Sequence, residues 1–532
     1  MPSDPAPPGP EPLGRGGADP VVVVGLGPVG ATLAALLGQS GVPVVVLERE
    51  AAGYALPRAA HLDDDALRVL DAVGVADEVA AAGRPLDGFR LVDARGRTLL
   101  HARKRVDVET GWPAATLVHQ PTVERALRSR LAEIQSVEVR TEHTVETVEE
   151  DAGGVLVRGT SQAGPFSVRA SFVVGCDGAR SRVREAMGTR LVGGRFEQPW
   201  LVVDTLLARD VDLPTDLLQI ADARRPATFV PFPGRRRRWE FRLLPGETER
   251  EMVQPDAVRT LLAPHVDPDA VEVERAAVYT FHDLVARPWR RGRLLLAGDA
   301  AHQMPPFLGQ GLGVGLQDAA MLAWALALVW RGGADPSLLD AFEAERRPHV
   351  EAVTRLAVRL GRLVSAGGLA AHVRDAALHA AGRVGPLRRA LLGIEAGLPA
   401  VRPALGQPPR RARVPNADLV APDGSRTRLD RLVGPRFGVV GVGLDARAWA
   451  TESDVWARLG AGFVTVDGPG AGAFVDPAGL LARWAGPAPC ALVVRPDRLA
   501  LGVYGPSGGS RAAVDAGRSL LAFRADGPGR SA

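Results

Sequence analysis

Residues 21–30 read VVVVGLGPVG, and this stretch decides the fold. Four consecutive valines are typical of a strand buried on both faces of a parallel sheet. The sequence ATLAALLGQSG at 31–41 then predicts a helix, and VPVVVLE at 42–48 predicts a second buried strand. This order predicts a βαβ unit that binds a dinucleotide.

The glycines of the turn have the G-x-G-x-x-G spacing, at Gly25, Gly27 and Gly30. Such glycines allow a tight turn, close approach of the backbone to a pyrophosphate, and close packing of helix on strand. Glu48 follows about twenty residues on, where a carboxylate can bind a ribose. A purely structural glycine turn is the weaker alternative. The motif alone leaves NAD and FAD open.

Two later motifs bear on that choice, VVGCDGARS at 173–181 and LLLAGDAAHQMPPFLGQGLGVGLQDAAMLAW at 294–324. A plain NAD domain would be finished in one contiguous unit. Here the nucleotide fold opens at residue 21 and its other half returns near residue 293. The segments between, 86–118 and 196–289, alternate apolar and polar residues as antiparallel strands do.

Other segments carry weaker signals. Residues 60–82 predict a helix capped by the run Asp63–Asp65, with a metal site at His61 and Asp63 as the weaker alternative. The run Arg235–Arg238 predicts a solvated hairpin rather than a phosphate clamp. A helical region continues to about residue 400. Beyond a Pro/Arg-rich linker, FGVVGVG, GFVTVDG and CALVVRP predict strands, with a helix over 445–460.

Composition excludes several classes. The net charge of the 532 residues is only +3, and arginine is spread along the chain, which argues against nucleic-acid binding. Cys176 and Cys490 form no CxxC motif, and no His/Cys/Asp cluster suggests a metal. No apolar run approaches the length of a membrane span, and residues 1–19 lack the apolar core of a signal peptide. We expect a cytoplasmic protein that does not bind membranes.

With these motifs in order, the chain resembles the class A flavoprotein monooxygenases of para-hydroxybenzoate hydroxylase fold. Within that group it is most similar to 3-(3-hydroxyphenyl)propionate hydroxylase and related phenol hydroxylases. The likeness also rests on shorter segments, which are PRA at 57–59, DDDALR at 63–68, GWP at 111–113, HQP at 119–121, LPGET at 244–248, ERRPH at 345–349 and VVRPDR at 493–498.

The resemblance implies an α/β architecture: a Rossmann-like FAD-binding domain with an inserted antiparallel β-sheet substrate domain, followed by a thioredoxin-like α/β domain. The expected division is a flexible tail at 1–19, the FAD domain at 20–195 and 290–365 with 86–118 partly in the substrate sheet, the substrate domain at 196–289, a helical segment and linker at 366–414, and the thioredoxin-like domain at 415–532. Having only Cys490, that last domain cannot perform dithiol chemistry. We expect this domain to have a structural role or to serve as an assembly surface. A homodimer is possible.

The resemblance also implies roles for single residues. Pro306 would place its carbonyl at the reacting edge of the substrate. Asp177, Gly178 and Arg180 would serve both FAD and the nicotinamide cofactor. The other implied FAD contacts are Gly25, Gly27, Val29 and Gly30 at the pyrophosphate, Glu48 at the ribose, Arg49 beside the adenosine, Asp299 at the ribityl chain, Arg58 and Gln120 at the flavin, and Gly309, Gly311 and Leu312 along the isoalloxazine ring.

Some alternatives stay open for these residues. Arg58 could be a surface ion pair, Gln120 a turn partner, and His302 a packed structural histidine rather than a base. Relatives often carry Asn where this chain has Gly313 and Met321, and Lys where it has Ala325. A helix from Gly311 would aim its amino end at the flavin, where negative charge develops on reduction. Phenol binding could involve His282, Arg224, Arg225 or Arg242.

The predicted reaction is hydroxylation of a small phenolic substrate with NADH or NADPH and O2, through a flavin hydroperoxide. The cofactor carries the difficult chemistry, and the protein supplies position and electrostatics. The main alternative is a polyketide-tailoring or antibiotic-modifying hydroxylase, which shares every motif. A non-catalytic flavin-binding protein is a third. A flavin halogenase is disfavoured because the chain lacks a W-x-W-x-I-P segment and its only lysine, Lys104, lies in the polar run ARKRVD.

Overall fold

The valine run at 21–24 forms an interior strand, β1, of a six-stranded sheet. This is seen in a computed structural model that describes residues 19–53, 59–86, 88–103, 109–382, 398–409, 411–470, 472–486 and 489–523. All four valines are buried, as a strand covered on both faces requires. In sheet order the strands are β18 (Arg290–Arg291), β19 (Leu294–Leu296), β12 (Phe172–Gly175), β1 (Val21–Val24), β2 (Val44–Leu47) and β8 (Val137–Arg140).

The pairs of this sheet are parallel except at its edge, where β18 runs antiparallel to β19. The predicted βαβ unit is confirmed, because helix α1 (Pro28–Gln39) joins β1 to β2. Helix α8 (Gly311–Trp330) packs against α1. By length and composition α8 could cross a membrane, but 89% of its most apolar window is buried within the protein. It is therefore the core helix of this layer.

The segment predicted as one helix over 60–82 divides into three elements. Strand β3 (His61–Asp63) comes first, then α2 (Asp64–Val73) and α3 (Ala76–Ala82). The capping prediction is confirmed, since Asp63 Oδ1 accepts a hydrogen bond from the Ala66 N–H at 2.8 Å. The single long helix was wrong because Gly74, at φ 96°, ends α2 in the left-handed conformation. Strand β3 pairs with β7 (Ala115–Leu117), which also pairs with β4 (Arg84–Pro85).

Most of the predicted antiparallel strands lie in one eight-stranded sheet. In sheet order they are β20 (His302–Gln303), β17 (Val271–Arg287), β13 (Arg190–Leu207), β16 (Arg236–Arg242), β15 (Ala227–Val230), β14 (Leu217–Ile220), β5 (Gly88–Val92) and β6 (Thr98–Arg103). The β14–β5 pair is parallel, contrary to prediction. These two strands lie more than 100 residues apart in the chain, so no short hairpin forces them antiparallel.

The prediction of a solvated hairpin for the run Arg235–Arg238 is wrong in part. Arg235 is exposed, but Arg238 is only 3% exposed and its Nε donates to Asp204 Oδ1 at 2.8 Å. Residues alternate faces along β16, so every second arginine must point inward. The run is thus not a uniformly solvated hairpin.

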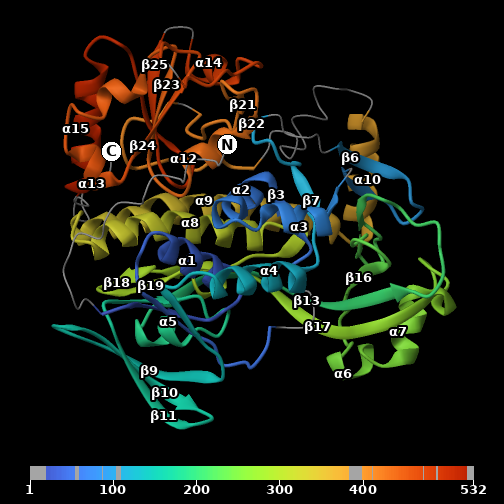
Figure 1. Cartoon of the computed structure of the whole chain (residues 1–532). Coiled ribbons are helices and arrows are strands. Elements are labelled where there is room, and N and C mark those ends of the chain that lie inside the picture. The colour runs from blue at the N-terminus through green and yellow to red at the C-terminus, as the bar shows by residue number, and fades with distance from the viewer. Residues whose placement is uncertain are drawn as a thin grey trace.

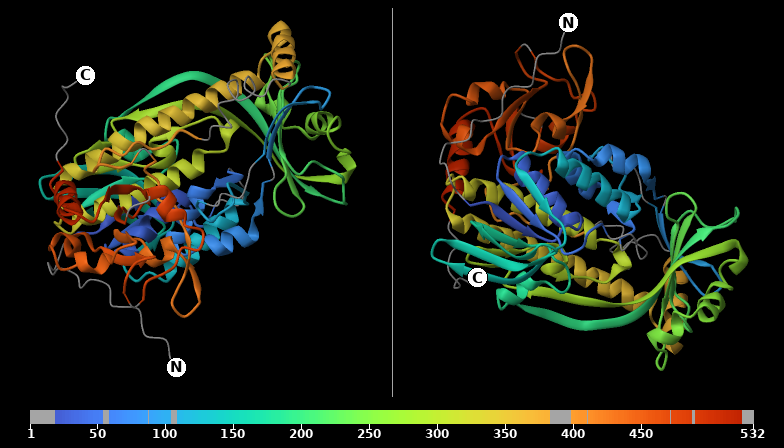
Figure 2. Two further views of the ribbon diagram at one scale, coloured as in Figure 1. Left: turned by 90° about the horizontal axis from the view of Figure 1, so that it is seen from above. Right: turned by 60° about the horizontal axis from the view of Figure 1, so that its bottom comes forward.

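Strands β13 and β17 are long enough to connect two parts of the molecule (Figure 1). They run from the layer of the parallel sheet to a separate lobe, where β16 and the helices α6 (Glu249–Met252) and α7 (Pro255–Leu262) lie (Figures 1 and 2). A further sheet of β9 (His143–Asp151), β10 (Gly154–Ser161) and β11 (Gly164–Ala170) projects from the opposite end. The remaining helices are α4 (Gln120–Ala132), α5 (Arg182–Ala186), α9 (Asp340–Val364) and α10 (Gly368–Gly382).

The C-terminal region forms a four-stranded sheet in the order β24-β23-β25-β26, with β23 parallel to β24 and antiparallel to β25. The three predicted strands are confirmed. The predicted helix over 445–460 is wrong, because a 3-10 turn (Ala446–Trp449) and α13 (Val455–Leu459) divide it. The other bounds are β21 (Asp418–Val420), β22 (Arg426–Arg428), α12 (Leu429–Val433), β23 (Gly438–Val442), β24 (Gly462–Val466), α14 (Leu480–Ala485), β25 (Cys490–Val494), β26 (Ala500–Tyr504) and α15 (Gly509–Leu521).

Buried ion pairs join this region to the helices beneath it, α2 and α9 (Figure 1). Arg68 of α2 binds both carboxylate oxygens of Asp430, at 2.7 and 2.9 Å. Arg495 binds both oxygens of Glu345 in α9, each at 2.9 Å. All four side chains are 5% exposed or less. The two regions therefore share one interior, because breaking such a pair leaves a buried charge without a partner.

Candidate active site

Three glycine-containing turns follow three neighbouring parallel strands. The register pairs Val24 of β1 with Gly175 of β12, and Gly175 with Leu296 of β19. Because parallel strands end at the same edge, the turns at Gly25, Asp177 and Gly298 lie side by side there. The crevice beyond the carboxyl ends of a parallel sheet is where such folds bind their ligands. The two motifs that lie nearly 300 residues apart thus flank a third.

The three glycines of the first turn differ in what surrounds them. A Cβ at Gly25 would lie 2.5 Å from the Cys176 carbonyl oxygen, and one at Gly30 would lie 2.1 Å from the Gly25 oxygen. A Cβ at Gly27 would meet no atom within 4 Å among the described residues other than its two chain neighbours. Gly25 and Gly30 are therefore required by packing of the protein on itself. Gly27 instead leaves open space beside the first turn of α1, whose N–H groups have no intrahelical acceptor.

Val29 brings the first and last motifs into contact. A Cβ at Gly298 would lie 3.0 Å from Val29 Cγ2. A Cβ at Gly315 of α8 would lie 2.7 Å from the same atom. Val29 is thus packed against both the turn after β19 and helix α8. Its side chain is occupied in joining the two halves of the sheet layer.

Glu48 at the end of β2 braces the first turn. Its two oxygens accept hydrogen bonds from the N–H groups of Leu26, at 2.7 Å, and Glu50, at 3.0 Å. Each carboxylate oxygen keeps a second lone pair, so the group can still bind a ribose hydroxyl. Arg49 beside it is exposed and pairs with Glu50 at 3.1 Å.

The second turn centres on Asp177. Its Oδ2 accepts hydrogen bonds from the N–H groups of Arg182, at 2.7 Å, and Val183, at 3.3 Å, at the start of α5. Its Oδ1 is buried and, within the described residues, has no hydrogen-bond partner. Burial raises the pKa of this carboxyl against the hydrogen bonds that lower it. Gly178 faces open space at φ 76°, and Arg180 is exposed. The Asp177 carboxylate therefore braces this turn from the interior, while Gly178 presents the backbone of the turn to open space.

The third turn is held from below by Asp318, a residue that the sequence reasoning missed. Its Oδ2 accepts hydrogen bonds from the Gly298 N–H, at 3.2 Å, and from His302 Nε2, at 2.6 Å. Its Oδ1 accepts one from Arg346 Nε at 2.8 Å, and Arg346 Nη2 donates to the Val314 carbonyl at 3.0 Å. Burial alone raises the pKa of Asp318, but the charges of His302 and Arg346 outweigh burial and hold it below its ordinary value. The sequence signal for this role was a single aspartate within the mainly apolar segment 311–330.

Within this turn Asp299 is exposed on a 3-10 turn (Gly298–Ala300), where its carboxylate can reach a ligand. Pro306 is exposed at the start of the next such turn (Pro306–Leu308), and its carbonyl accepts a hydrogen bond from Gly309 at 2.8 Å. Gly309 adopts φ 66°. Helix α8 begins at Gly311, as predicted, so its first N–H groups emerge beside these residues. Leu312 is half-buried there.

Gln120, one of the predicted flavin contacts, is bonded to protein groups. Gln120 is 7% exposed; its Oε1 accepts from the Ala59 N–H at 2.7 Å, and its Nε2 donates to Glu124 Oε1 at 2.7 Å. These bonds match the alternative in which Gln120 supports a turn. Arg58 lies outside the described residues. A Cβ at Gly313 would lie 3.3 Å from Asp63 Oδ1, the cap of α2.

The eight-stranded sheet presents one face to the Pro306 segment. Phe307 packs edge-on to Trp200 of β13, with ring centroids 5.5 Å apart, and also contacts Phe196 and Phe281. Val202 lies on the Trp200 face, since residues alternate along a strand. Val202 pairs with Glu240 on the next strand, Glu240 with Thr228, and Thr228 with Gln219. Thr228 Oγ1 donates a hydrogen bond to Gln219 Oε1 at 3.0 Å. These side chains form a polar row on the face that carries the aromatic cluster.

Glu240 is the acidic member of this row. It is 9% exposed, and its Oε1 lies 4.0 Å from Arg238 Nη1. Burial raises its pKa, against the opposing charge of Arg238. Arg238 is committed to Asp204, which Arg275 Nη2 also contacts at 2.6 Å. Sequence reasoning missed this row, because single polar residues in alternating strands do not reveal which face they share.

The four side chains considered for phenol binding are placed differently. Arg225 binds Glu247 and donates to the Arg242 carbonyl at 2.8 Å. Arg242 Nη1 donates to the Ser365 carbonyl at 3.2 Å. The Arg224 side chain is 88% exposed, and His282 lies opposite Glu197 in the sheet. In the described ranges, no group of three or more His, Cys, Asp or Glu side chains is arranged to hold a metal ion.

Comparison with known proteins agrees with this geometry. A family described as FAD binding domain matches residues 19–357, and one described as HcaD C-terminal domain matches 413–517. The chain is 38% identical over 523 residues to a probable NADH-specific resorcinol 4-hydroxylase of Rhodococcus jostii, covering 93% of each chain. It is 36% identical to a 3-(3-hydroxy-phenyl)propionate/3-hydroxycinnamic acid hydroxylase of Burkholderia vietnamiensis, covering 84% of each.

A solved structure is similar along the same length. Anhydrotetracycline hydroxylase of Streptomyces rimosus matches with a TM-score of 0.78 and 27% identity, covering 96% of this chain and all of that one. The family matched over residues 19–357 contains all three turns, at Gly25, Asp177 and Gly298.

Proposed function

Because this chain belongs to the family of aromatic hydroxylases built on the FAD binding domain, we propose that it hydroxylates a small phenolic compound with NADH and O2. The chain is an FAD-dependent enzyme, so the non-catalytic alternative is set aside. One observation supports this placement of the cofactor: Val29 packs against Gly298 and Gly315, so residues 21–30 and 294–315 lie together.

The residues present fit FAD. The open position at Gly27 and the first turn of α1 would receive the pyrophosphate, and Glu48 the ribose. Asp299 would bind the ribityl chain, and the amino end of α8 would stabilise negative charge on the ring. Bound FAD supplies hydride acceptance and activation of oxygen. The residues that would hold the ring are those at the amino end of α8 and in the Pro306 segment.

We propose that the polar row on the sheet selects the substrate. Phe281, the partly exposed member of the aromatic cluster with Trp200 and Phe307, offers apolar contact for a benzene ring. The Glu240 carboxylate is the group that would accept the phenolic hydrogen bond and so favour the electron-rich form of the ring. Relatives named for resorcinol and hydroxyphenylpropionate support a single-ring phenol.

The test is substrate-stimulated oxidation of NADH by the FAD-loaded enzyme. Resorcinol and 3-(3-hydroxyphenyl)propionate should each accelerate it, and mass spectrometry under 18O2 should find one labelled oxygen in the product. NADPH at equal concentration should be a poorer reductant. Oxidation that no single-ring phenol stimulates would overturn this substrate class.

A second candidate substrate class is a polycyclic one. The similarity to anhydrotetracycline hydroxylase, over 96% of this chain, favours a tailoring reaction. Its identity of 27% is lower than the 36–38% of the phenol hydroxylases. Anhydrotetracycline in the same assay separates the two classes.

We also propose the following division of the chain into domains. The divided FAD domain at 20–195 and 290–365, and the substrate domain at 196–289, are supported by the two sheets that β13 and β17 connect. The order β24-β23-β25-β26, with one parallel and two antiparallel pairs, supports a thioredoxin-like C-terminal domain. A homodimer and a cytoplasmic location stay predictions.

A further inference from the structure

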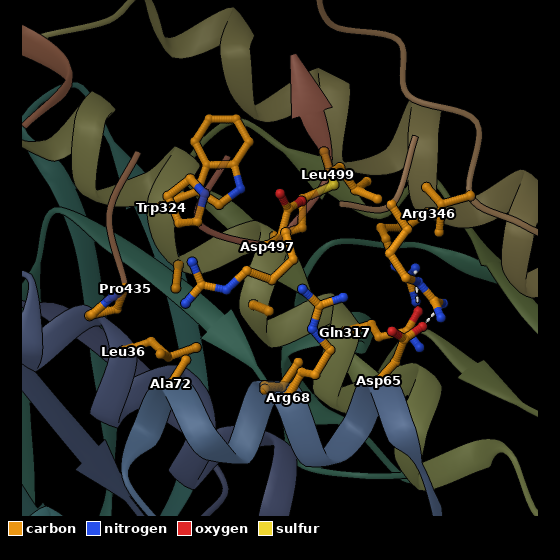
Figure 3. A pocket seen from close by; sticks show the side chains of 18 of the residues that line it. Leu36, Asp65, Arg68, Ala72, Gln317, Trp324, Arg346, Pro435, Asp497 and Leu499 are labelled. Carbon is orange, nitrogen blue, oxygen red and sulfur yellow. Dashed lines mark hydrogen bonds and ion pairs between the residues drawn. The ribbon is translucent and has the colours of Figure 1, made fainter. Parts of the chain in front are cut away.

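A cavity of about 70 Å³ lies where the C-terminal region covers α2 and α8 (Figure 3). None of its lining residues is among those predicted to touch FAD. Its walls come from α2, with Arg68 and Ala72; from α8, with Ala320 and Met321; and from the C-terminal region, with Arg498 and Leu499. A water needs about 10–15 Å³ of such space, so the cavity can hold a small organic molecule.

Two arginines in this cavity have donors without acceptors. Arg68 is 2% exposed and Arg498 is 6% exposed. Arg68 commits Nε and Nη2 to Asp430 and the Val414 carbonyl, and Arg498 commits Nη2 to the carbonyls of Asp430 and Gly434. The Nη1 of each is buried and meets no acceptor in the described part of the chain. Figure 3 shows Arg68 rising from α2 toward Asp497 across the space.

The nearby carboxylates do not serve these donors. Asp430 is shared, because it pairs with Arg68 at 2.7 Å and with Arg498 at 3.4 Å. Asp65 is paired with Arg413, and Asp497 with Arg495, which also serves Glu345. Two buried guanidinium groups therefore share one carboxylate. A buried donor without a partner is energetically unfavourable, and more so when it carries a charge.

We propose that this cavity is a binding site for a small monocarboxylate with an apolar tail. Its two oxygens would accept from Arg68 Nη1 and Arg498 Nη1, as charge-assisted hydrogen bonds. Its tail would lie against Val69, Ala72, Met321 and Leu499, which give the cavity an apolar wall. Such a ligand bridges α2 and the C-terminal region. It therefore stabilises their union without entering the flavin site.

The probe is butyrate, which carries no ring to mimic the aromatic substrate. Titration calorimetry on the FAD-loaded enzyme, at constant ionic strength with chloride, should give one site per chain, unchanged by saturating resorcinol. Ala72→Leu fills the cavity from α2 and should weaken butyrate at least tenfold. Ala516→Leu is the matched control: Ala516 is also a partly buried helical alanine of the same apolar core, and it does not line the cavity. It should bind like the wild type.

Ala320→Leu fills the cavity from α8 and serves if Ala72→Leu fails to retain its flavin spectrum. A crystal structure with butyrate gives the direct answer, with density bridging Arg68 and Arg498 expected. The absence of binding heat at 50 mM overturns the site. So does equal binding by the wild type and the filled variant, or butyrate seen only in the flavin cleft.

Discussion

The carboxylate of Asp318 in α8 accepts a hydrogen bond from the backbone N–H of Gly298 across 3.2 Å. This bond ties the core helix to the turn that presents Asp299. The same carboxylate is paired with Arg346, which in turn binds the Val314 carbonyl in the first helical turn of α8. The turn and the helix start, which are both proposed to face the cofactor, are thus positioned by one buried anion.

Replacing Asp318 with Asn should lower the free energy of unfolding by about 3 kcal/mol, because Arg346 loses its buried counter-charge. It should also weaken FAD binding, since Gly298 and Val314 lose their common support. Urea unfolding and titration of the apoenzyme with FAD measure the two effects. Asp340→Asn, which breaks the more exposed pair with Arg290, should cost less than about 1 kcal/mol. Equal effects of the two substitutions would contradict this role.

Alanine at Gly27 and at Gly30 should have opposite consequences. Gly30→Ala places a Cβ 2.1 Å from a backbone oxygen and should cost about 1–3 kcal/mol of stability. Gly27→Ala meets open space in the protein and should leave stability within about 0.5 kcal/mol. It should nevertheless weaken FAD tenfold or more, because the methyl group lies where the pyrophosphate approaches. Unchanged FAD affinity in Gly27→Ala would place the cofactor elsewhere.

Sequence patterns located the three turns because each combines a buried strand with glycines, and both signals are local. Val21–Val24, the G-x-G-x-x-G turn and the start of α8 at Gly311 all lie where they were predicted. The parallel β14–β5 pair and the partners of Asp318 could not be predicted in this way. They depend on contacts between segments far apart in the chain, which no local pattern records.

Glu240→Gln tests the polar row of the substrate sheet. The substitution keeps the shape of a side chain that is 9% exposed, so FAD binding should be unchanged. It removes the carboxylate proposed to accept the phenolic hydrogen bond, so kcat/KM for a phenol should fall about tenfold or more, roughly 1.4 kcal/mol. The acidic limb of the pH profile, which the raised pKa of Glu240 sets, should disappear. A profile identical to that of the wild type would exclude Glu240 from substrate binding.

His349 should make stability depend on pH below neutrality. Burial, aided by the charge of Arg346, lowers the pKa of this imidazole to about 3. The folded protein therefore keeps His349 neutral, while the unfolded chain takes up a proton as the pH falls through about 6.5. The contribution of neutral His349 to the free energy of unfolding is fully present above that pH. It should fall by about 2 kcal/mol between pH 7 and pH 5.

Urea unfolding at several pH values measures the slope. His349→Gln should remove this part of it, whereas His372→Gln, at an exposed position, should retain it. The same slope in both variants would show that other groups are responsible.

The order of strands in the parallel sheet also governs when the enzyme can acquire its cofactor. Strand β19 is the last to join, and the residues that follow it complete the nucleotide crevice. During synthesis on the ribosome, the crevice therefore stays incomplete until Leu296 and α8 have emerged. We therefore expect flavin capture to come late in synthesis, once β19 and the start of α8 are available.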